Sequence, residues 1–314
     1  MIVINILIAL CIAVLLYVLF SYIIVSIAYK KQGYDTHVNY DEIIPNDAVD
    51  IEITETDVKT EDGFTIHLYE TEVEEPLGVV LLLTGINHLS VTQFFGHAKM
   101  FAEAGYSSVM MEARAHGKSE GEHITFGVHD VRDVRATVDY IRSRMIYTKL
   151  PLTIMGFSMG AATSVNSAAL IPDIDALISC ASFSRWEDVS TEYIITKGCP
   201  AFIAKLLRPC LTVHGRIKFG ADFLTHQPEK TIRKLGEKKS LFIHSRGDKT
   251  VLLENNNRLR KNYHGHNAIF WRRNIDSHYV TDRKNFMQPW LDVEYKERLL
   301  DFLQEVINEK IAYV

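Results

Sequence analysis

The sequence has few cysteines and no surplus of basic residues, and each shortage excludes a class of protein. The four cysteines among 314 residues have neither the spacing of zinc ligands nor that of a disulfide framework. The formal net charge of -5 provides no basic patch, so we expect no nucleic-acid partner. Internal repeats and low-complexity tracts are absent from the sequence. With 47% hydrophobic residues, the chain suits one large globular domain with an appendage.

Charge is missing altogether from the N-terminal segment. Residues 1–28 contain no charged side chain, and about twenty such residues in a helix cross a hydrocarbon core of about 30 Å. We therefore predict a transmembrane helix over residues 1–29. The alternative is a cleaved signal peptide, because Ser-Ile-Ala at residues 26–28 resembles a cleavage site. The apolar region is long for a signal peptide, however, and no Lys or Arg precedes it.

Two lysines that follow this segment bear on its orientation. Lys30 and Lys31 come directly after the apolar stretch, and positive residues next to a span favour the cytoplasmic side of the membrane. The sequence therefore predicts a single-pass membrane protein whose catalytic domain lies in the cytoplasm. Residues 30–48 are mostly polar and are expected to form a linker between the membrane and that domain.

Strands and helices alternate along the rest of the chain. Such alternation is typical of a mostly parallel α/β sheet with helices on both faces. Two β-patterned runs joined at Asp62-Gly63 are expected to form an antiparallel edge. The predicted strands are 51–58, 64–69, 77–83, 106–111, 151–155, 174–181, 241–244 and 268–271. The predicted helices are 90–103, opened by a capping box at Ser90, then 128–144, a helix directly after Gly160, and 294–310.

The alternation is interrupted once, and the interruption divides the domain. Residues 185–236 are predicted to be a helical cap inserted into an α/β core that residues 49–184 and 237–314 form. Such a cap would lie over the sheet and cover the candidate serine nucleophile described next. We expect several short helices there rather than one long helix, because the apolar sequence is broken by Gly198, Pro200, Pro209, Gly215 and Gly220.

The pentapeptide Gly-Phe-Ser-Met-Gly at residues 156–160 is the most informative motif. It follows an apolar run of strand length and precedes a run of small residues, which predicts a strand, a sharp turn and a helix. This is the pattern of a nucleophile elbow, in which the turn holds a serine in a strained backbone conformation. Glycines two residues to each side let the neighbouring strand and helix approach closely. We therefore expect Ser158 to present its hydroxyl at the end of the sheet.

A serine hydroxyl needs a base, and the base needs a third group that orients it. His278 is the predicted base, because it alone among 13 histidines comes just after the last predicted strand. His264 and His266 precede that strand and are expected at the surface. Asp248 is the predicted acid, since it follows another buried strand and gives the chain order Ser, Asp, His.

Two other acids are alternatives to Asp248, and two backbone N–H groups are the predicted oxyanion donors. Asp276 and Asp282 flank the histidine in sequence and are rivals of the predicted acid, although adjacency along the chain rarely gives the required geometry. The tetrahedral intermediate needs two backbone N–H donors for its oxygen. Met159, directly after the serine, is predicted to supply one, and Ile86, after the strand 77–83, the other.

Residues 50–311 resemble the α/β-hydrolase superfamily, specifically its bacterial serine-hydrolase branch related to the prolyl oligopeptidase and serine aminopeptidase-like groups. The resemblance rests on residues 156–160, on Arg-Gly-Asp at 246–248, on Ser-His at 277–278, and on the loop 112–119, which is similar to the family's D-x-R-G-x-G-x-S. This sequence departs from the pattern where Glu112 stands for Asp, Ala115 for Gly, and Thr84 for a His before the oxyanion glycine. The resemblance implies an α/β-hydrolase fold with a Ser-Asp-His triad.

These features predict a serine hydrolase that cleaves a carboxylic ester, thioester or amide and needs no cofactor and no metal ion. Its substrate would be a small acyl compound or a short peptide. An aminopeptidase-like enzyme is an alternative, in which Glu187, Asp188 and Glu192 of the cap would hold the amino terminus of a peptide. A catalytically silent binding protein is a further alternative, because the fold alone does not guarantee activity.

Overall fold

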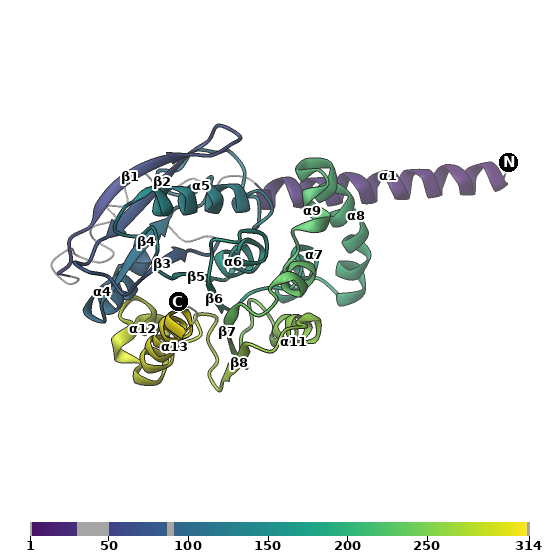
Figure 1. The fold of residues 1–314 in the computed structure, drawn as a ribbon. Coiled ribbons are helices and arrows are strands. Elements are labelled where there is room, and N and C mark those ends of the chain that lie inside the picture. The colour runs from purple at the N-terminus through teal and green to yellow at the C-terminus, as the bar shows by residue number, and fades with distance from the viewer. Residues whose placement is uncertain (1, 30–49, 87–90, 313–314) are drawn as a thin grey trace.

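An eight-stranded sheet lies at the centre of the computed structural model, which describes residues 2–29, 50–86 and 91–312 (Figure 1). The strand order is β1-β2-β4-β3-β5-β6-β7-β8, and β2 runs antiparallel to both of its neighbours while the other pairs are parallel. The predicted mostly parallel sheet with an antiparallel edge is therefore confirmed. The strands are β1 (Thr54–Lys59), β2 (Thr65–Thr71), β3 (Gly78–Leu83), β4 (Tyr106–Met111), β5 (Leu152–Phe157), β6 (Ala176–Cys180), β7 (Lys239–Ser245) and β8 (Ala268–Arg273).

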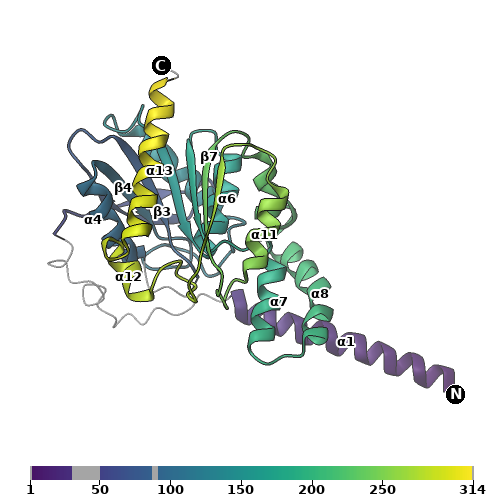
Figure 2. The same ribbon diagram turned by 90° about the horizontal axis from the view of Figure 1, so that it is seen from below.

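Helices cover both faces of the sheet, as Figure 2 shows. The helices α4 (Phe95–Glu103) and α13 (Val293–Ala312) pack on one face, and α5 (Asp130–Ser143), α6 (Met159–Leu170) and α11 (Leu253–Asn262) pack on the other. The remaining helical elements are α1 (Ile2–Tyr29), η1 (Val91–Phe94), α7 (Trp186–Thr196), α8 (Ala201–Phe219), α9 (Asp222–Thr225), α10 (Pro228–Thr231), η2 (Ile232–Lys234), α12 (Arg283–Met287) and η3 (Pro289–Leu291).

The central strand β3 shows why the sequence forms a sheet that is buried on both faces. All six of its residues are buried. Successive side chains of a strand point to opposite faces. Accordingly, Val80 and Leu82 join the apolar core beneath α4 and α13, whereas Val79, Leu81 and Leu83 join the core beneath α5 and α6. A continuous apolar run is what a parallel strand between two helical layers requires.

Two of the predicted helices differ in the structure. The helix predicted from residue 90 begins as the 3-10 turn η1 and becomes α-helical only at Phe95, and Ser90 itself lies outside the described residues. In the cap, Pro209 and Gly215 do not interrupt α8, which runs through both. Gly215 packs closely against Phe223, since an added Cβ would lie 2.3 Å from that ring. The packing of α8 against the domain thus outweighs the intrinsic cost of proline and glycine inside a helix.

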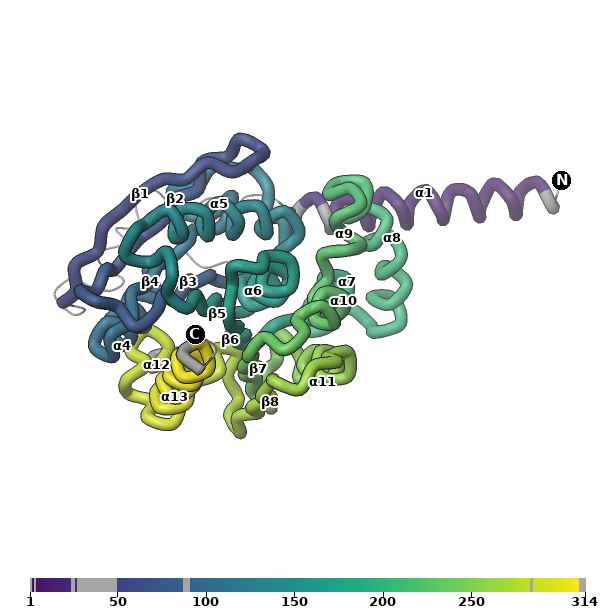
Figure 3. The backbone as a smooth tube through the Cα atoms, in the orientation of Figure 1, coloured from purple at the N-terminus to yellow at the C-terminus, as the bar shows by residue number. Residues whose placement is uncertain are grey.

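The cap helices and the N-terminal helix lie on the same side of the molecule. Figure 3 shows α7, α8, α9 and α10 gathered beside α6, with α1 passing along α8 and extending away from the sheet. Residues Ile4–Ile23 of α1 are long and apolar enough to cross a membrane. The predicted linker 30–48 lies outside the described residues, as do Lys30 and Lys31.

His97 of α4 makes stability depend on pH. The imidazole is fully buried among Phe94, Phe286 and Tyr295, with its Nε2 3.1 Å from the Tyr295 hydroxyl oxygen. Burial lowers the pKa of His97 to about 3, whereas a histidine of the unfolded chain titrates near 6.5. As the pH falls from about 6.5 towards 3, His97 therefore binds a proton in the unfolded chain but not in the folded chain. The free energy of unfolding decreases as a result.

We expect the free energy of unfolding to fall by about 2 kcal/mol between pH 6.5 and 5 on account of His97 alone. The variant His97→Gln, which cannot take up this proton, is expected to lose correspondingly less over the same interval. Urea unfolding of both proteins at the two pH values, followed by near-ultraviolet circular dichroism, measures the difference. Equal losses in the two proteins would show that His97 does not carry this dependence.

Candidate active site

Ser158 occupies the sharp turn between β5, which ends at Phe157, and α6, which begins at Met159. Its backbone has a φ of 54° and a ψ of -113°, a conformation that a residue with a side chain adopts only at a cost. The Ser158 N–H donates a hydrogen bond of 2.8 Å to the Cys180 carbonyl at the end of β6. The neighbouring strand thus helps hold the strained turn, and the serine is fixed at the carboxyl end of the sheet.

The two flanking glycines permit close contacts that a side chain would prevent. A Cβ at Gly156 would lie 2.1 Å from the Gly160 carbonyl oxygen. A Cβ at Gly160 would lie 2.3 Å from the Leu83 carbonyl oxygen and 2.5 Å from that of Thr84, which follows β3. At both positions an added Cβ would clash with backbone atoms, which cannot rotate away as a side chain could. The predicted reason for these glycines therefore agrees with the contacts at the turn.

His278 comes from the loop after β8 and reaches the serine. Its Nε2 lies 3.0 Å from the Ser158 hydroxyl oxygen, a hydrogen-bond distance. The imidazole packs against the ring of Phe157, with 4.9 Å between the ring centroids, and Tyr279 stacks on that same ring. Aromatic packing thus restricts the orientation of the imidazole.

Asp248 comes from the loop after β7 and contacts the other side of the imidazole. Its Oδ2 lies 2.7 Å from Nδ1 of His278. Its Oδ1 accepts backbone N–H bonds from Thr250 at 2.8 Å and from Val251 at 2.9 Å. The carboxylate is therefore fixed at both oxygens, and its buried position favours a histidine tautomer with the proton on Nδ1. Nε2 of that tautomer is free to accept a proton from the Ser158 hydroxyl.

A second histidine near Asp248 was not identified from the sequence. His244 of β7 is buried, and its Nε2 lies 2.8 Å from the Val251 carbonyl oxygen and 3.7 Å from Oδ2 of Asp248. Burial lowers the pKa of His244, although Asp248 opposes this. A neutral His244 donating to Val251 helps hold the turn whose N–H groups bind the carboxylate. Its only sequence signal is a histidine directly after the apolar run 241–243 of β7.

The rival residues occupy other positions. Asp276 lies over the backbone of Gly247, where an added Cβ would be 1.7 Å from its Oδ1. The Asp282 carbonyl accepts N–H bonds from residues 285 and 286 at the start of α12. His264 and His266 are exposed and precede β8, so they lie at the opposite end of that strand from His278. Among the described residues, the hydrogen bonds of the His278 imidazole go to Ser158 and Asp248.

The two predicted oxyanion donors come from adjacent strand ends. Met159 is the first residue of α6, and the first N–H groups of a helix have no acceptor within it. Ile86 follows β3, whose end abuts the elbow at Gly160. The side chains of Ile86 and Met159 pack in one apolar cluster. Met159 thus directly follows the serine at the positive end of the α6 dipole, and Ile86 packs against the cluster that contains Met159.

That apolar cluster includes residues from the cap and lies beside Ser158. Its members come from the turn after β4, from the elbow helix, and from α7 and α8. Trp186 of α7 packs against Phe126 with 5.3 Å between ring centroids. Leu211 of α8 is buried in the same cluster. An apolar surface next to the hydroxyl is suited to the hydrocarbon part of a substrate.

The acidic residues of the cap are paired within the protein. Asp188 lies 2.8 Å from Nε of Arg208 and 3.0 Å from Nη1 of Arg258. Glu192 accepts a hydrogen bond of 2.8 Å from Asn255, and burial raises the pKa of its carboxyl. Glu187 is buried and accepts hydrogen bonds from Thr212 and Gln227. The three carboxylates therefore already have partners.

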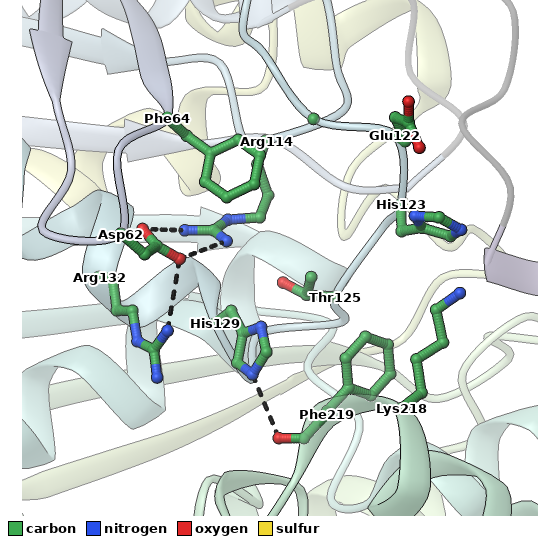
Figure 4. Close-up of a pocket in the computed structure, with 11 residues that line it drawn as sticks. Asp62, Phe64, Arg114, Glu122, His123, Thr125, His129, Arg132, Lys218 and Phe219 are labelled. Atoms are coloured by element: carbon green, nitrogen blue, oxygen red, sulfur yellow. Dashed lines mark hydrogen bonds and ion pairs between the residues drawn. The ribbon is translucent and has the colours of Figure 1, made fainter.

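A pocket of about 540 Å³ lies apart from the triad, between the β1–β2 hairpin, the loop that precedes α5 and the end of α8 (Figure 4). No residue of the triad lines it. Arg114 donates to Asp62 at 3.0 Å and to the buried Asp133 at 2.9 Å, and His129 bonds the Phe219 carbonyl at 3.2 Å. Arg114 thus pairs with two carboxylates, and Ser158, His278 and Asp248 do not reach this pocket.

Comparisons with known proteins agree with this fold. A family model described as serine aminopeptidase, S33, matches residues 74–258. The uncharacterized protein YqkD of Bacillus subtilis (strain 168) is 23% identical over 230 residues, which are 71% of this chain and 72% of YqkD.

Solved structures resemble this chain in their fold. The esterase Pf2001 of Pyrococcus furiosus has a TM-score of 0.65 at 17% identity, over 83% of this chain and 95% of the esterase. The α/β hydrolase GrgF from Penicillium sp. sh18 has a TM-score of 0.62 at 13% identity, over 82% of this chain and the whole of GrgF. The predicted α/β-hydrolase fold is confirmed.

Proposed function

The chain belongs to the serine aminopeptidase S33 family of α/β-hydrolases, and we propose that it is a serine hydrolase that acts through an acyl-enzyme on Ser158. Its substrate is a carboxylic ester, thioester or amide. The observation that carries this proposal is the unbroken hydrogen-bonded series from Ser158 through His278 to Asp248, at 3.0 Å and 2.7 Å. This is the arrangement that activates a serine hydroxyl as a nucleophile.

The proposed reaction has two halves that use the same base. The Ser158 oxygen attacks the carbonyl carbon while Nε2 of His278 takes the hydroxyl proton, and the Asp248 carboxylate stabilises the resulting imidazolium. The backbone N–H groups of Met159 and Ile86 bind the oxyanion. The imidazolium then protonates the leaving group as the acyl-enzyme forms. In the second half, His278 deprotonates a water molecule that attacks the acyl-enzyme, and the proton returns to the Ser158 oxygen.

We further propose that α1 anchors the enzyme in the membrane as a single span and that the catalytic domain lies in the cytoplasm. The anchor is supported by the absence of charged residues from α1 and by the length of its apolar span, Ile4–Ile23. The two lysines after the apolar segment support the orientation. Residues 185–236 are proposed to act as the cap over Ser158, supported by the α7 and α8 side chains in the apolar cluster beside it.

An aminopeptidase is the second candidate, and the description of the family model favours it. Such an enzyme needs an unpaired carboxylate that receives the amino terminus of its substrate. The candidates Glu187, Asp188 and Glu192 are instead bound by arginine, amide and hydroxyl groups. Together with the apolar cluster beside the serine, this pairing favours an uncharged acyl substrate over a peptide amino terminus.

We expect the purified full-length enzyme to prefer esters over aminoacyl amides by at least about tenfold in kcat/KM. Turnover of p-nitrophenyl acetate, butyrate and octanoate, compared with alanyl and prolyl p-nitroanilides, measures this preference, with Ser158→Ala protein as the blank. Faster turnover of the anilides would support the aminopeptidase instead. No turnover of any substrate, combined with no labelling by a fluorophosphonate, would support a catalytically silent binding protein.

A further inference from the structure

Helix α8 of the cap exposes an apolar stripe that the core does not use. Phe202, Leu206, Val213 and Ile217 are each between 56% and 76% exposed. Their spacing of four, seven and four residues places them on one face of the helix. The core takes the opposite face of α8, where Ala204, Leu207, Leu211 and Gly215 are buried. An exposed apolar stripe along a helix of 19 residues, about 28 Å long, marks an interaction surface.

The charges of α8 are all of one sign. Within its 19 residues there is no Asp or Glu. A helix with an apolar face and basic residues around it is typical of proteins that lie in the interface of a bilayer, where the basic side chains meet anionic headgroups. Of the basic residues of α8, Lys205 and Arg216 lie next to the stripe, whereas Arg208 is paired with Asp188 and Lys218 lines the pocket beside the β1–β2 hairpin.

The position of α8 relative to α1 points to the same partner. The Tyr17 hydroxyl donates to the Leu206 carbonyl, and the Tyr22 ring lies 5.6 Å from that of His214. Figures 1 and 2 both show the two helices side by side. Tyr17 and Tyr22 belong to the C-terminal third of the span Ile4–Ile23, from which the chain continues towards the domain. If α1 crosses the membrane, α8 therefore lies at the boundary between hydrocarbon and headgroups.

We propose that the stripe of Phe202, Leu206, Val213 and Ile217 inserts into the membrane interface on the side of the catalytic domain. This inference rests on the proposed membrane anchor. The partner is the lipid surface rather than a second copy of the chain, because Leu206 of the stripe contacts Tyr17 inside the span Ile4–Ile23, so the lipid that surrounds α1 also reaches the stripe.

Helix α8 also lies between the proposed lipid surface and the proposed active site. The buried face of α8 contributes Leu211 and Phe219 to the apolar cluster that also contains Met159. One helix therefore separates the lipid surface from the apolar surface beside Ser158. A substrate dissolved in the bilayer reaches the cap without first entering water, which favours acyl compounds that partition into lipid.

The test measures the environment of α8 in the full-length protein reconstituted into vesicles of phosphatidylcholine and phosphatidylglycerol. A fluorescent NBD group is attached to Ile217→Cys in a background where Cys11, Cys199 and Cys210 are replaced by serine or alanine, while the buried Cys180 is kept. The matched control is Met145→Cys, whose native side chain is 94% exposed just after α5. Nitroxide-labelled lipids and iodide, the latter on both sides of the vesicle, serve as quenchers.

We expect the lipid-borne nitroxide to quench the probe at residue 217 strongly, and iodide to quench it at least about fivefold less than the probe at Met145. Equal iodide quenching at the two sites would overturn the inference. A probe shielded from both quenchers would indicate a second copy of the chain and would also overturn it. Phe202→Cys repeats the test at the other end of the stripe, and circular dichroism checks each variant's fold. Quenching requires no turnover, so an inactive enzyme could still show the expected quenching. The inference and the proposed enzymatic function can therefore fail independently.

Discussion

Ser158→Ala is expected to lower kcat/KM for a soluble p-nitrophenyl ester by about 10⁴-fold or more. In the proposed mechanism the hydroxyl oxygen forms the acyl-enzyme, and His278 has no second hydroxyl among its described hydrogen-bond partners. The oxyanion donors survive in the variant, so a small residual rate above that of water is expected. The fold is expected to remain, because the substitution removes only one oxygen. The turn itself is held by the close contacts at Gly156 and Gly160 and by backbone hydrogen bonds.

The measurement compares the steady-state rates of the wild type, Ser158→Ala and a matched serine variant, Ser143→Ala. Ser143 donates a hydrogen bond to the Tyr140 carbonyl in the last turn of α5, which precedes the amino end of β5, whereas Ser158 follows its carboxyl end. Removal of the Ser143 hydroxyl is expected to change kcat/KM by less than about threefold. Thermal unfolding of all three proteins separates a loss of chemistry from a loss of fold. A Ser158→Ala enzyme that keeps its rate to within tenfold would exclude Ser158 as the nucleophile.

Asp248→Asn is expected to lower kcat by about 10⁴-fold, and the contacts of the carboxylate explain why. Oδ1 of Asp248 accepts the N–H groups of Thr250 and Val251. The amide oxygen of an asparagine takes this position, because its NH₂ group has no proton acceptor there. The NH₂ group then faces Nδ1 of His278 and forces the proton onto Nε2. An imidazole in that tautomer cannot accept the proton of Ser158.

The rival acid provides the control for this prediction. Asp276→Asn makes the same chemical change two residues before His278, at an acid that packs on Gly247. It is expected to reduce kcat by less than about tenfold, because the hydrogen bond to Nδ1 remains. Pre-steady-state release of p-nitrophenol from both variants measures the acylation step directly. A larger loss in Asp276→Asn than in Asp248→Asn would reverse the assignment.

That Ser158, His278 and Asp248 lie together was predictable, because the fold brings these positions to one place. Ser158, Asp248 and His278 each follow a strand of one parallel run, and the carboxyl ends of β5, β7 and β8 lie at the same edge. A short sequence pattern therefore specified residues 120 positions apart in the chain. The glycines were predictable for a similar reason, since the contacts at Gly156 and Gly160 are set by the elbow itself.

Other features depend on contacts that no local pattern contains. The continuity of α8 through Pro209 follows from the packing of its buried face, including Gly215 against Phe223. The position of His244 next to the loop that carries Asp248 depends on its hydrogen bond to the Val251 carbonyl. The mutual pairing of Asp188 with two arginines requires α7, α8 and α11 to be assembled first. Tertiary packing decides such features, so local propensity does not predict them.

The most direct test of the triad is the site of covalent labelling. Full-length protein is incubated with a fluorophosphonate, digested, and mapped by mass spectrometry, beside a His278→Ala variant. We expect one phosphonyl adduct, on the Ser158 oxygen of the wild type, and at least about 10³-fold slower labelling of His278→Ala, because the hydroxyl has lost its base. An adduct on another residue, or equally fast labelling of both proteins, would contradict the proposed triad.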